Sequence, residues 1–189
     1  MEHWLPPCVK EKEIWAWWEG AFTDKELDWL QQKARESTIE GEAGGEVKEE
    51  TRRNKIDWLR NTPDTNWVFE KLGFIAASLN SEHFNFDLDG FHEPLQLCSY
   101  HEEEQGEYKW HQDFGGPFCR KLSLVLQLSD PSEYEGGNLQ IKASTNVITL
   151  KKQRGIITVF PSWTLHQVTP VVKGNRQSLV AWIAGPQFK

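Results

Sequence analysis

Two histidines and an aspartate in the second half of the chain have the types and spacing of metal ligands. His111 and Asp113 are separated by one residue. On an extended segment, residues two apart point to the same side, so both side chains can bind one metal ion. His166 is the natural third ligand if its strand folds beside that of His111. Two imidazoles and one carboxylate on one face leave coordination positions open, which is the ligand set of non-heme Fe(II) oxygenases.

The remaining histidines offer weaker alternatives. A chance His-x-Asp pair is common in a chain with six histidines, so the pair alone does not identify a metal site. His101 and Glu103 form a His-x-Glu pair, but they belong to an acidic run that indicates a solvated turn. His3, His83 and His92 show no ligand spacing, and we expect surface or capping roles for them.

Arg176 follows His166 by ten positions, at the start of the last predicted strand. A buried guanidinium is a planar fork that matches a carboxylate, and an unpaired one in an apolar barrel would be costly. A dicarboxylic 2-oxo acid could therefore chelate iron at one end and meet Arg176 at the other. The alternative is an exposed hairpin arginine, which propensity alone favours equally.

The elements that must position these residues change in character about halfway along the chain. Thr23 and Glu26 form a capping box, which predicts a helix over residues 24–37. A second helix is predicted to start near Pro63 and to end before Asn80. Residues 40–54, rich in Gly and Glu, are predicted to be a loop. Strands are predicted over 84–88, 95–100, 121–128, 138–141, 147–150, 155–160, 164–168 and 176–184.

Short strands separated by Gly, Pro, Asn and Asp turns are typical of a β-sandwich or barrel, and about eight of them fit a jelly roll. We therefore predict a mainly β fold: a double-stranded β-helix (jelly roll, cupin-like) with supporting N-terminal α-helices. The 189 residues are expected to form a single domain. Within it, residues 1–83 would be helical support and loop, and 84–189 the jelly-roll core.

Composition excludes some partners and compartments. The net charge of −7 repels phosphate backbones, so nucleic acid is an unfavourable partner. No apolar run is long enough to span a bilayer, and residues 1–7 lack the pattern of a secretory signal. Cys8, Cys98 and Cys119 form no Cys-x-x-Cys pair, which favours reduced thiols and a cytoplasmic location.

Two other patterns concern the surface. The basic runs 52–53 and 151–154 are predicted to be solvated. The cluster Trp15-Ala16-Trp17-Trp18 belongs either to the core or to a contact surface, because large aromatic side chains serve both roles.

The stretch from about Pro94 to the C-terminus resembles the prolyl 4-hydroxylase-like branch of the 2-oxoglutarate oxygenases, especially the bacterial PKHD-type hydroxylases. The matching runs are Tyr108-x-x-His111-x-Asp113, Leu128-Ser129-Asp130-Pro131-x-x-Tyr134-x-Gly136-Gly137-x-Leu139, Phe160-Pro161-Ser162 and His166-x-Val168-x-Pro170-Val171-x-x-Gly174-x-Arg176. They occur in order over roughly half of the chain. Residues 52–59 are loosely similar to the family's N-terminal segment.

The resemblance implies metal ligands at His111, Asp113 and His166, and Arg176 as the anchor of the distal carboxylate of 2-oxoglutarate. It implies that Tyr100 assists this anchor and that Tyr108 lies near the iron on the substrate side.

Two departures from the family pattern matter. Many prolyl 4-hydroxylases carry Lys in place of Arg176, which weakens the case for a prolyl substrate but not for the co-substrate. Some relatives also have a tyrosine on the strand equivalent to residues 122–126, where this chain has none. The carboxylate would then rest on Arg176 and Tyr100 alone, or on Thr158 or another hydroxyl.

The implied activity is that of an Fe(II)- and 2-oxoglutarate-dependent dioxygenase, which hydroxylates an unactivated C–H bond and forms succinate and CO2. The leading substrate is a prolyl residue in a peptide or protein, with dioxygen as co-substrate, and ascorbate often helps relatives to keep iron reduced. A small molecule or free amino acid is the alternative substrate. A non-catalytic jelly-roll binding module, or the same fold with zinc or nickel, is the alternative function. Loop 40–54 would be either a lid or a surface insertion.

Overall fold

A large antiparallel sheet forms the centre of the molecule. The structure, a computed structural model, describes residues 14–43, 45–115 and 117–187. The strand order in this sheet is β1-β13-β9-β15-β7-β6-β2, and β10 pairs with β15 beside this path. In chain order these strands are β1 (Ala16–Trp18), β2 (Ile39–Glu40), β6 (Lys55–Leu59), β7 (Leu95–His101), β9 (Arg120–Gln127), β10 (Tyr134–Gly136), β13 (Ile157–Pro161) and β15 (Val171–Ala184).

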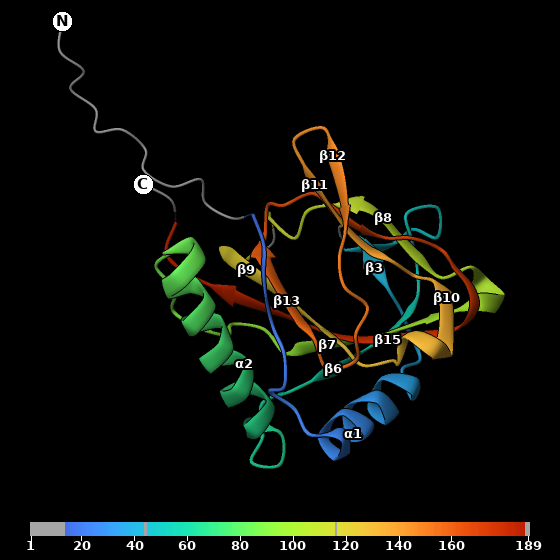
Figure 1. Cartoon of the computed structure of the whole chain (residues 1–189), viewed down its shortest axis with the longest axis horizontal. Coiled ribbons are helices and arrows are strands. Elements are labelled where there is room, and N and C mark those ends of the chain that lie inside the picture. Colours follow the sequence, from blue (N-terminus) through green and yellow to red (C-terminus); the bar gives the residue numbers. More distant parts are fainter. Residues whose placement is uncertain (1–13, 44, 116, 188–189) are drawn as a thin grey trace, which may run out of the picture.

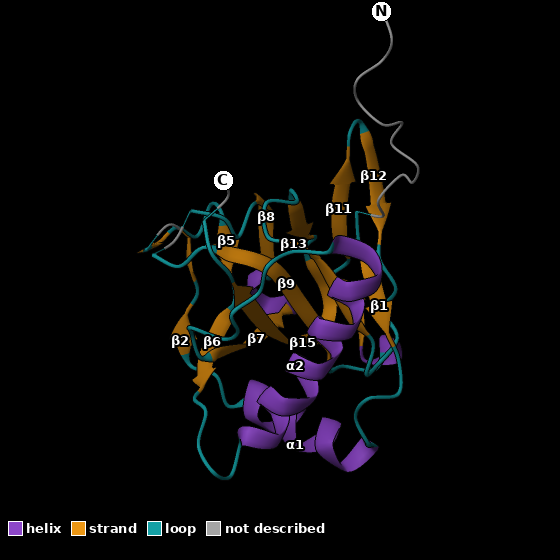
Figure 2. Cartoon of the chain, turned by 90° about the vertical axis from the view of Figure 1, so that its left-hand side faces the viewer, coloured by secondary structure: helices purple, strands orange, loops and turns teal. Residues whose placement is uncertain are grey.

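A smaller sheet packs against one face of the large sheet. Its order is β12-β11-β14-β8-β5, with bounds Asn146–Thr149, Leu139–Ala143, His166–Val168, Glu107–His111 and Arg52–Arg53. A separate hairpin joins β3 (Glu42–Ala43) and β4 (Glu46–Val47). Buried apolar side chains from both sheets, including Ile56, Val125, Ile141 and Phe160, fill the space between them. The two facing sheets form the predicted jelly roll (Figure 2).

Two helices cover the other face of the large sheet (Figure 1). They are α1 (Asp24–Arg35) and α2 (Asn66–Leu79), and α2 continues into a π-helical turn (Asn80–Phe84). Short 3-10 turns span Glu102–Glu104 and Pro131–Glu133. Buried leucines of the helices, such as Leu30 and Leu72, belong to one apolar cluster with Leu97 and Leu124 of the sheet. Each such leucine stabilises the fold by about 1.5–3 kcal/mol.

The alternation of side chains along β7 explains why both of its faces are buried. Leu95 and Leu97 belong to the cluster on the helix side, whereas Cys98 and Tyr100 belong to the cluster between the sheets. Because side chains alternate between the two faces of a strand, polar residues two positions apart point to the same face. A buried strand can therefore deliver reactive side chains into the interior of the jelly roll while its other face packs on helices.

Most predicted elements are found, with shifted ends. The capping box is confirmed: the Thr23 hydroxyl accepts from the backbone N–H of Glu26, and the Glu26 carboxylate accepts from that of Thr23. Helix α1 ends at Arg35, two residues before the predicted end at 37. The strands predicted from residue 95 onward correspond to β7, β9, β11, β12, β13, β14 and β15.

One predicted strand is wrong, and one predicted helix starts later than expected. Residues 84–88 form no strand, because α2 runs on into the π-helical turn and Asn85 adopts a left-handed conformation. The Asn80 side chain then holds both the N–H and the carbonyl of Phe86. The second helix begins at Asn66 and not near Pro63, because residues 62–65 form a turn closed by the Thr65 hydroxyl.

The segment before residue 84 contributes strands as well as helices. β1 pairs with β13 at one edge of the large sheet, and β6 pairs with β7 near the other. The predicted loop 40–54 contains the β3–β4 hairpin and β5, so it is largely ordered by strand pairing. In the cluster of β1, Ala16 is buried and Trp17 is 42% exposed. No helix of the described residues is both long and apolar enough to cross a membrane.

Candidate metal centre

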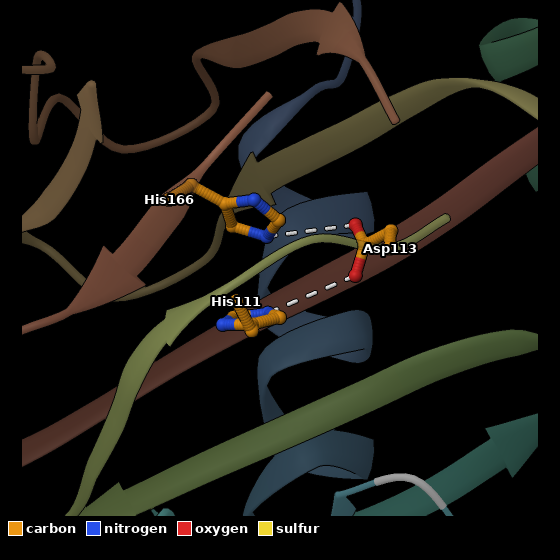
Figure 3. Close-up of side chains that lie close together, drawn as sticks. All are labelled: His111, Asp113 and His166. Carbon is orange, nitrogen blue, oxygen red and sulfur yellow. Dashed lines mark ion pairs between the residues drawn. The ribbon is translucent and has the colours of Figure 1, made fainter. Parts of the chain in front are cut away.

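His111, Asp113 and His166 converge on one point between the two sheets (Figure 3). One ligand atom from each lies within 4.8 Å of the others. The Nε2 atoms of His111 and His166 lie 3.7 Å and 3.5 Å from the two carboxylate oxygens of Asp113. Strand pairing causes this convergence, because His166 of β14 is directly opposite His111 of β8 in the smaller sheet.

A β-bulge shapes the β8 side of the site. Val168 is opposite Tyr108 and His166 is opposite His111, so β8 has one more residue than β14 over this stretch. A bulge of this kind changes which side chains share a face. It accounts for the fact that Tyr108 and His111 both line the cavity although they are three residues apart.

Backbone carbonyls fix the orientation of both imidazoles in the same way. Nδ1 of His111 donates to the carbonyl oxygen of Lys109 (2.7 Å), and Nδ1 of His166 donates to that of Thr164 (2.8 Å). A carbonyl oxygen can only accept, so each Nδ1 carries the proton and each Nε2 keeps a free lone pair. Both lone pairs are on the atoms that face Asp113, which is the arrangement a metal ion requires.

Asp113 is held from two directions, just beyond the end of β8. Its backbone N–H donates to the carbonyl of Ser162, and the Ser123 hydroxyl donates to its Oδ2 at 2.7 Å. Ser123 also contacts the hydroxyl of Ser162 at 3.1 Å. These bonds connect the ligand to β9 and to the end of β13, so the carboxylate has little freedom to turn away from the histidines.

The protonation states of the ligands suit metal binding. Burial, reinforced by the neighbouring His166, lowers the pKa of His111 to about 3. Burial acts to raise the pKa of Asp113, but His166, His111 and the Ser123 hydroxyl outweigh it and hold that pKa below its ordinary value. At neutral pH the site therefore offers a neutral imidazole at His111 and an ionised carboxylate at Asp113.

Arg176 is buried in the same cavity and has only neutral partners. It is 1% exposed and lies opposite Tyr100 in the pairing of β15 with β7. Its Nη1 donates to the Ser178 hydroxyl (3.2 Å) and its Nη2 to the Gln127 side-chain oxygen (3.0 Å). Its Nε has no hydrogen-bond partner among the residues that the structure describes. A buried guanidinium in this state lacks an anion, and a carboxylate would supply both the charge and the missing acceptor.

The two predicted tyrosines are both in the cavity wall. The Tyr100 ring lies under the guanidinium of Arg176, with 5.2 Å between the ring centre and Cζ. Burial raises the pKa of Tyr100, so its phenol stays protonated and can donate a hydrogen bond. Tyr108 stacks on the imidazole of His111, with 3.4 Å between ring centres. Thr158, the alternative hydroxyl, is buried on β13 and does not line this cavity, whereas Ser178 does.

A cavity of about 560 Å³ is lined by the three candidate ligands together with Arg176, both tyrosines and Ser178. Alternate residues of β15, from Arg176 to Trp182, form one wall, and alternate residues of β7, from Gln96 to Tyr100, form another. Exposed apolar side chains border it, namely Ile39, Trp58 and Phe114. The volume is in the range of small-molecule sites, so the cavity can hold a dicarboxylic acid and part of a second molecule.

Sequence reasoning missed several side chains of this site. Ser123 and Gln127 contact Asp113 and Arg176, respectively. On β9, Leu alternates with Ser, Val and Gln, so a period-two analysis could have assigned both polar residues to the interior. Arg120 pairs with Glu93 through two contacts and donates to the carbonyl of Asp113 at 3.2 Å. No spacing in the sequence indicates that pair.

The prediction of a solvated Arg52 is wrong. Arg52 is 7% exposed and lines the cavity, because its side chain turns inward from β5. The adjacent Arg53 stays near the surface and pairs with Glu107 at 2.7 Å. In the second basic run, Arg154 pairs with Asp28 and donates to the carbonyl of Leu128. That run is only partly solvated.

The rival histidines are placed elsewhere. His101 belongs to the end of β7 beside the exposed 3-10 turn Glu102–Glu104, away from the three clustered ligands. His92 is exposed and lies 3.1 Å from Asp89. His83 is close to Glu82 and Phe84. His3 and Cys8 lie outside the described residues.

Comparisons with known proteins agree with this geometry. Residues 95–184 match the family model of the 2OG-Fe(II) oxygenase superfamily. A PKHD-type hydroxylase of Cupriavidus metallidurans is 38% identical over 78 residues, which are 41% of this chain and 34% of that protein. One from Prochlorococcus marinus is 47% identical over 62 residues, 33% of this chain and 28% of that protein. The matches thus span about a third of these relatives.

Solved structures resemble the chain over most of its length. A Pseudomonas putida prolyl-4-hydroxylase superposes with a TM-score of 0.74 at 20% identity, covering 90% of this chain and 92% of that one. A Trichoplax adhaerens prolyl hydroxylase, solved with a peptide of hypoxia inducible factor, gives a TM-score of 0.76 at 14% identity, covering 91% and 84%. At these identities the likeness establishes the fold.

Fold and site together define a jelly-roll protein in which two histidines and one carboxylate form a candidate metal site. Residues 95–184 match the 2OG-Fe(II) oxygenase superfamily, and the curated proteins that the chain resembles over part of their length are PKHD-type hydroxylases.

Proposed function

We propose that the protein is an Fe(II)- and 2-oxoglutarate-dependent dioxygenase that hydroxylates a prolyl residue of a peptide or protein and forms succinate and CO2. One observation carries the proposal: a buried guanidinium without an anion shares a cavity with a two-histidine, one-carboxylate cluster. The side chains fit both groups. Nitrogen and oxygen donors with open positions suit Fe(II), and Arg176 suits a distal carboxylate.

When bound, Fe(II) with 2-oxoglutarate supplies the oxidising power that no side chain has. The protein supplies the side chains that position the metal and the co-substrate. His111, Asp113 and His166 would hold the metal through atoms that their hydrogen bonds already aim at one point. Arg176, with Ser178 and Tyr100 beside it, would hold the far end of the co-substrate. The buried apolar wall keeps bulk water from the reacting atoms.

A prolyl substrate is supported first by the similar proteins. The two similar structures are prolyl hydroxylases, and one was solved with a peptide. The exposed aromatic side chains Trp58 and Phe114 at the edge of the cavity suit an extended peptide with an apolar residue. We propose a reducing, cytoplasmic location because Cys98 and Cys119 are free thiols. We also propose ascorbate as the reductant that keeps the iron active.

The test is consumption of 2-oxoglutarate by the purified protein with Fe(II), ascorbate, oxygen and a panel of proline-containing peptides. We expect succinate to form and at least one peptide to gain the mass of one oxygen atom. His111→Ala, which removes a ligand, should abolish both. Succinate without any modified peptide would retain the oxygenase and reject the prolyl substrate. No succinate under any condition would reject the enzyme and favour the binding module.

A further inference from the structure

A second buried arginine lines the cavity, and the proposed reaction leaves it without a role. The guanidinium of Arg52 donates to the Asn54 side-chain oxygen (2.7 Å), to the Glu42 backbone carbonyl (2.9 Å) and to the Gln96 side-chain oxygen (2.7 Å). Every one of these acceptors is neutral. Within residues 14–43, 45–115 and 117–187, Arg52 and Arg176 form no ion pair, whereas the nearby Arg120 pairs with Glu93.

Arg52 lies close to the metal ligands. Its Cζ is 4.5 Å from the centre of the Tyr108 ring, and that ring stacks on His111 with 3.4 Å between centres and 15° between planes. A single aromatic ring therefore separates the guanidinium from a metal ligand. Ile39 and Trp58, at the exposed edge of the cavity, line it together with Arg52. Arg52 itself is buried, at 7% exposure, and lines the same cavity as these exposed side chains.

The charges in the cavity wall do not balance. The Arg120–Glu93 pair is neutral, and Fe(II) with the dianion of 2-oxoglutarate would add no net charge. Asp113 then offsets one of the two guanidinium groups of Arg52 and Arg176, and one positive charge remains. Glu42 also borders the cavity, but its side chain is exposed, where water and salt screen its charge. An uncompensated buried charge is costly, so an anion is the expected partner.

We propose that the substrate brings this anion: the α-carboxylate of the reacting residue itself, bound by Arg52. This inference rests on the oxygenase activity of the proposed function and restricts its substrate to one with a free α-carboxylate. The Nη1 group donates to the Glu42 backbone carbonyl, and the guanidinium as a whole carries the positive charge that a substrate carboxylate would meet. The substrate would then be the C-terminal residue of a peptide or a free amino acid, because a residue inside a chain has no carboxylate of its own on its backbone.

The test compares matched acids and amides bound to the wild-type protein. The anaerobic protein, loaded with Fe(II) and 2-oxoglutarate, is titrated with N-acetylproline and N-acetylprolinamide, and with N-acetylleucine and N-acetylleucinamide. Quenching of tryptophan fluorescence reports binding, since Trp58 and Trp182 line the cavity. We expect the acid of at least one pair to bind about 10- to 100-fold more tightly than its amide, as for a charge-assisted contact. If no pair shows a preference, or nothing binds, the proposal is wrong.

Further titrations distinguish a free amino acid from a C-terminal residue and test whether Arg52 binds the carboxylate. Free L-proline and L-leucine, set against their N-acetyl forms, distinguish a free amino acid from a C-terminal residue. Arg52→Gln should remove the preference for the acid, and Arg52→Lys should restore part of that preference. The matched control Arg53→Gln removes a guanidinium outside the cavity wall and should keep the preference. A preference that survives in Arg52→Gln contradicts the role of Arg52. Because binding is measured without turnover, this result is independent of whether succinate forms.

Discussion

At the level of single residues, the site depends on hydrogen bonds that hold its side chains before any ligand arrives. His111 and His166 each donate Nδ1–H to the carbonyl oxygen two positions earlier in the chain. Their tautomers are therefore set by local backbone geometry. Asp113 depends instead on a distant residue, because Ser123 of β9 donates to its carboxylate. The histidines should tolerate changes elsewhere in the fold better than Asp113 does.

Ser123→Ala tests that difference. The variant removes the 2.7 Å hydrogen bond to Asp113, so the carboxylate should turn more freely. We expect the affinity for Fe(II) to fall about 10- to 100-fold, the usual effect of losing such a supporting contact. Anaerobic titration measures it, with Ser78→Ala on the exposed face of α2 as the control. Unchanged affinity in Ser123→Ala would show that this hydroxyl does not support the ligand.

Among the turns, the one at the end of β10, where Gly137 follows Gly136, brings the backbone close to the buried arginine. Gly137 has a φ of 54°, and a Cβ placed there would lie 3.0 Å from Cδ of Arg176. Gly137→Ala should therefore cost about 1–2 kcal/mol of stability through left-handed strain and also displace the guanidinium. Gly20→Ala is a matched control, since its φ is 76° and a Cβ there meets nothing within 4 Å.

Both glycine variants should lose similar stability in chemical unfolding, but only Gly137→Ala should weaken binding of 2-oxoglutarate to the Fe(II)-loaded protein. Calorimetry of co-substrate binding measures the second effect. Equal affinity in the two variants would contradict the role of Arg176 as the carboxylate anchor.

The pairing of the two helices should depend on pH. Glu26 caps α1 and lies 2.8 Å from Lys71 of α2. Burial acts to raise the pKa of Glu26, but hydrogen bonds from Lys71 and Thr23 outweigh it, so the folded pKa is below its ordinary value of 4.5. A depressed pKa stabilises the fold above the unfolded value, and this stabilisation is lost as the pH falls through the folded value.

Glu26→Gln should therefore lower the melting temperature at pH 7, and the difference from wild type should shrink towards pH 3. Thermal unfolding at both values measures it, with the exposed Glu103→Gln as the control. A difference that stays constant between the two pH values would mean that the charge of Glu26 does not contribute.

At the scale of the whole molecule, local patterns predicted the jelly roll well and the cavity only in part. Period-two alternation indicated β7, β9 and the strands from β11 to β15, and the spacing of His111, Asp113 and His166 indicated a shared metal. The bulge in β8 and the inward turn of Arg52 depend on pairing between distant strands, which no local pattern encodes. The predicted strand 84–88 failed because the two hydrogen bonds from Asn80 to Phe86 override β propensity.

The central claim is that one cavity binds Fe(II) and 2-oxoglutarate together. Its most direct measurement is an anaerobic titration with Fe(II) and then 2-oxoglutarate, followed by visible absorption. We predict one Fe(II) per chain and a charge-transfer band that appears only when both are present. His111→Ala should lose the metal and the band, whereas Arg176→Met should keep the metal and need far more 2-oxoglutarate. Stoichiometric Fe(II) binding by His111→Ala, or no band in the wild type, would contradict the account.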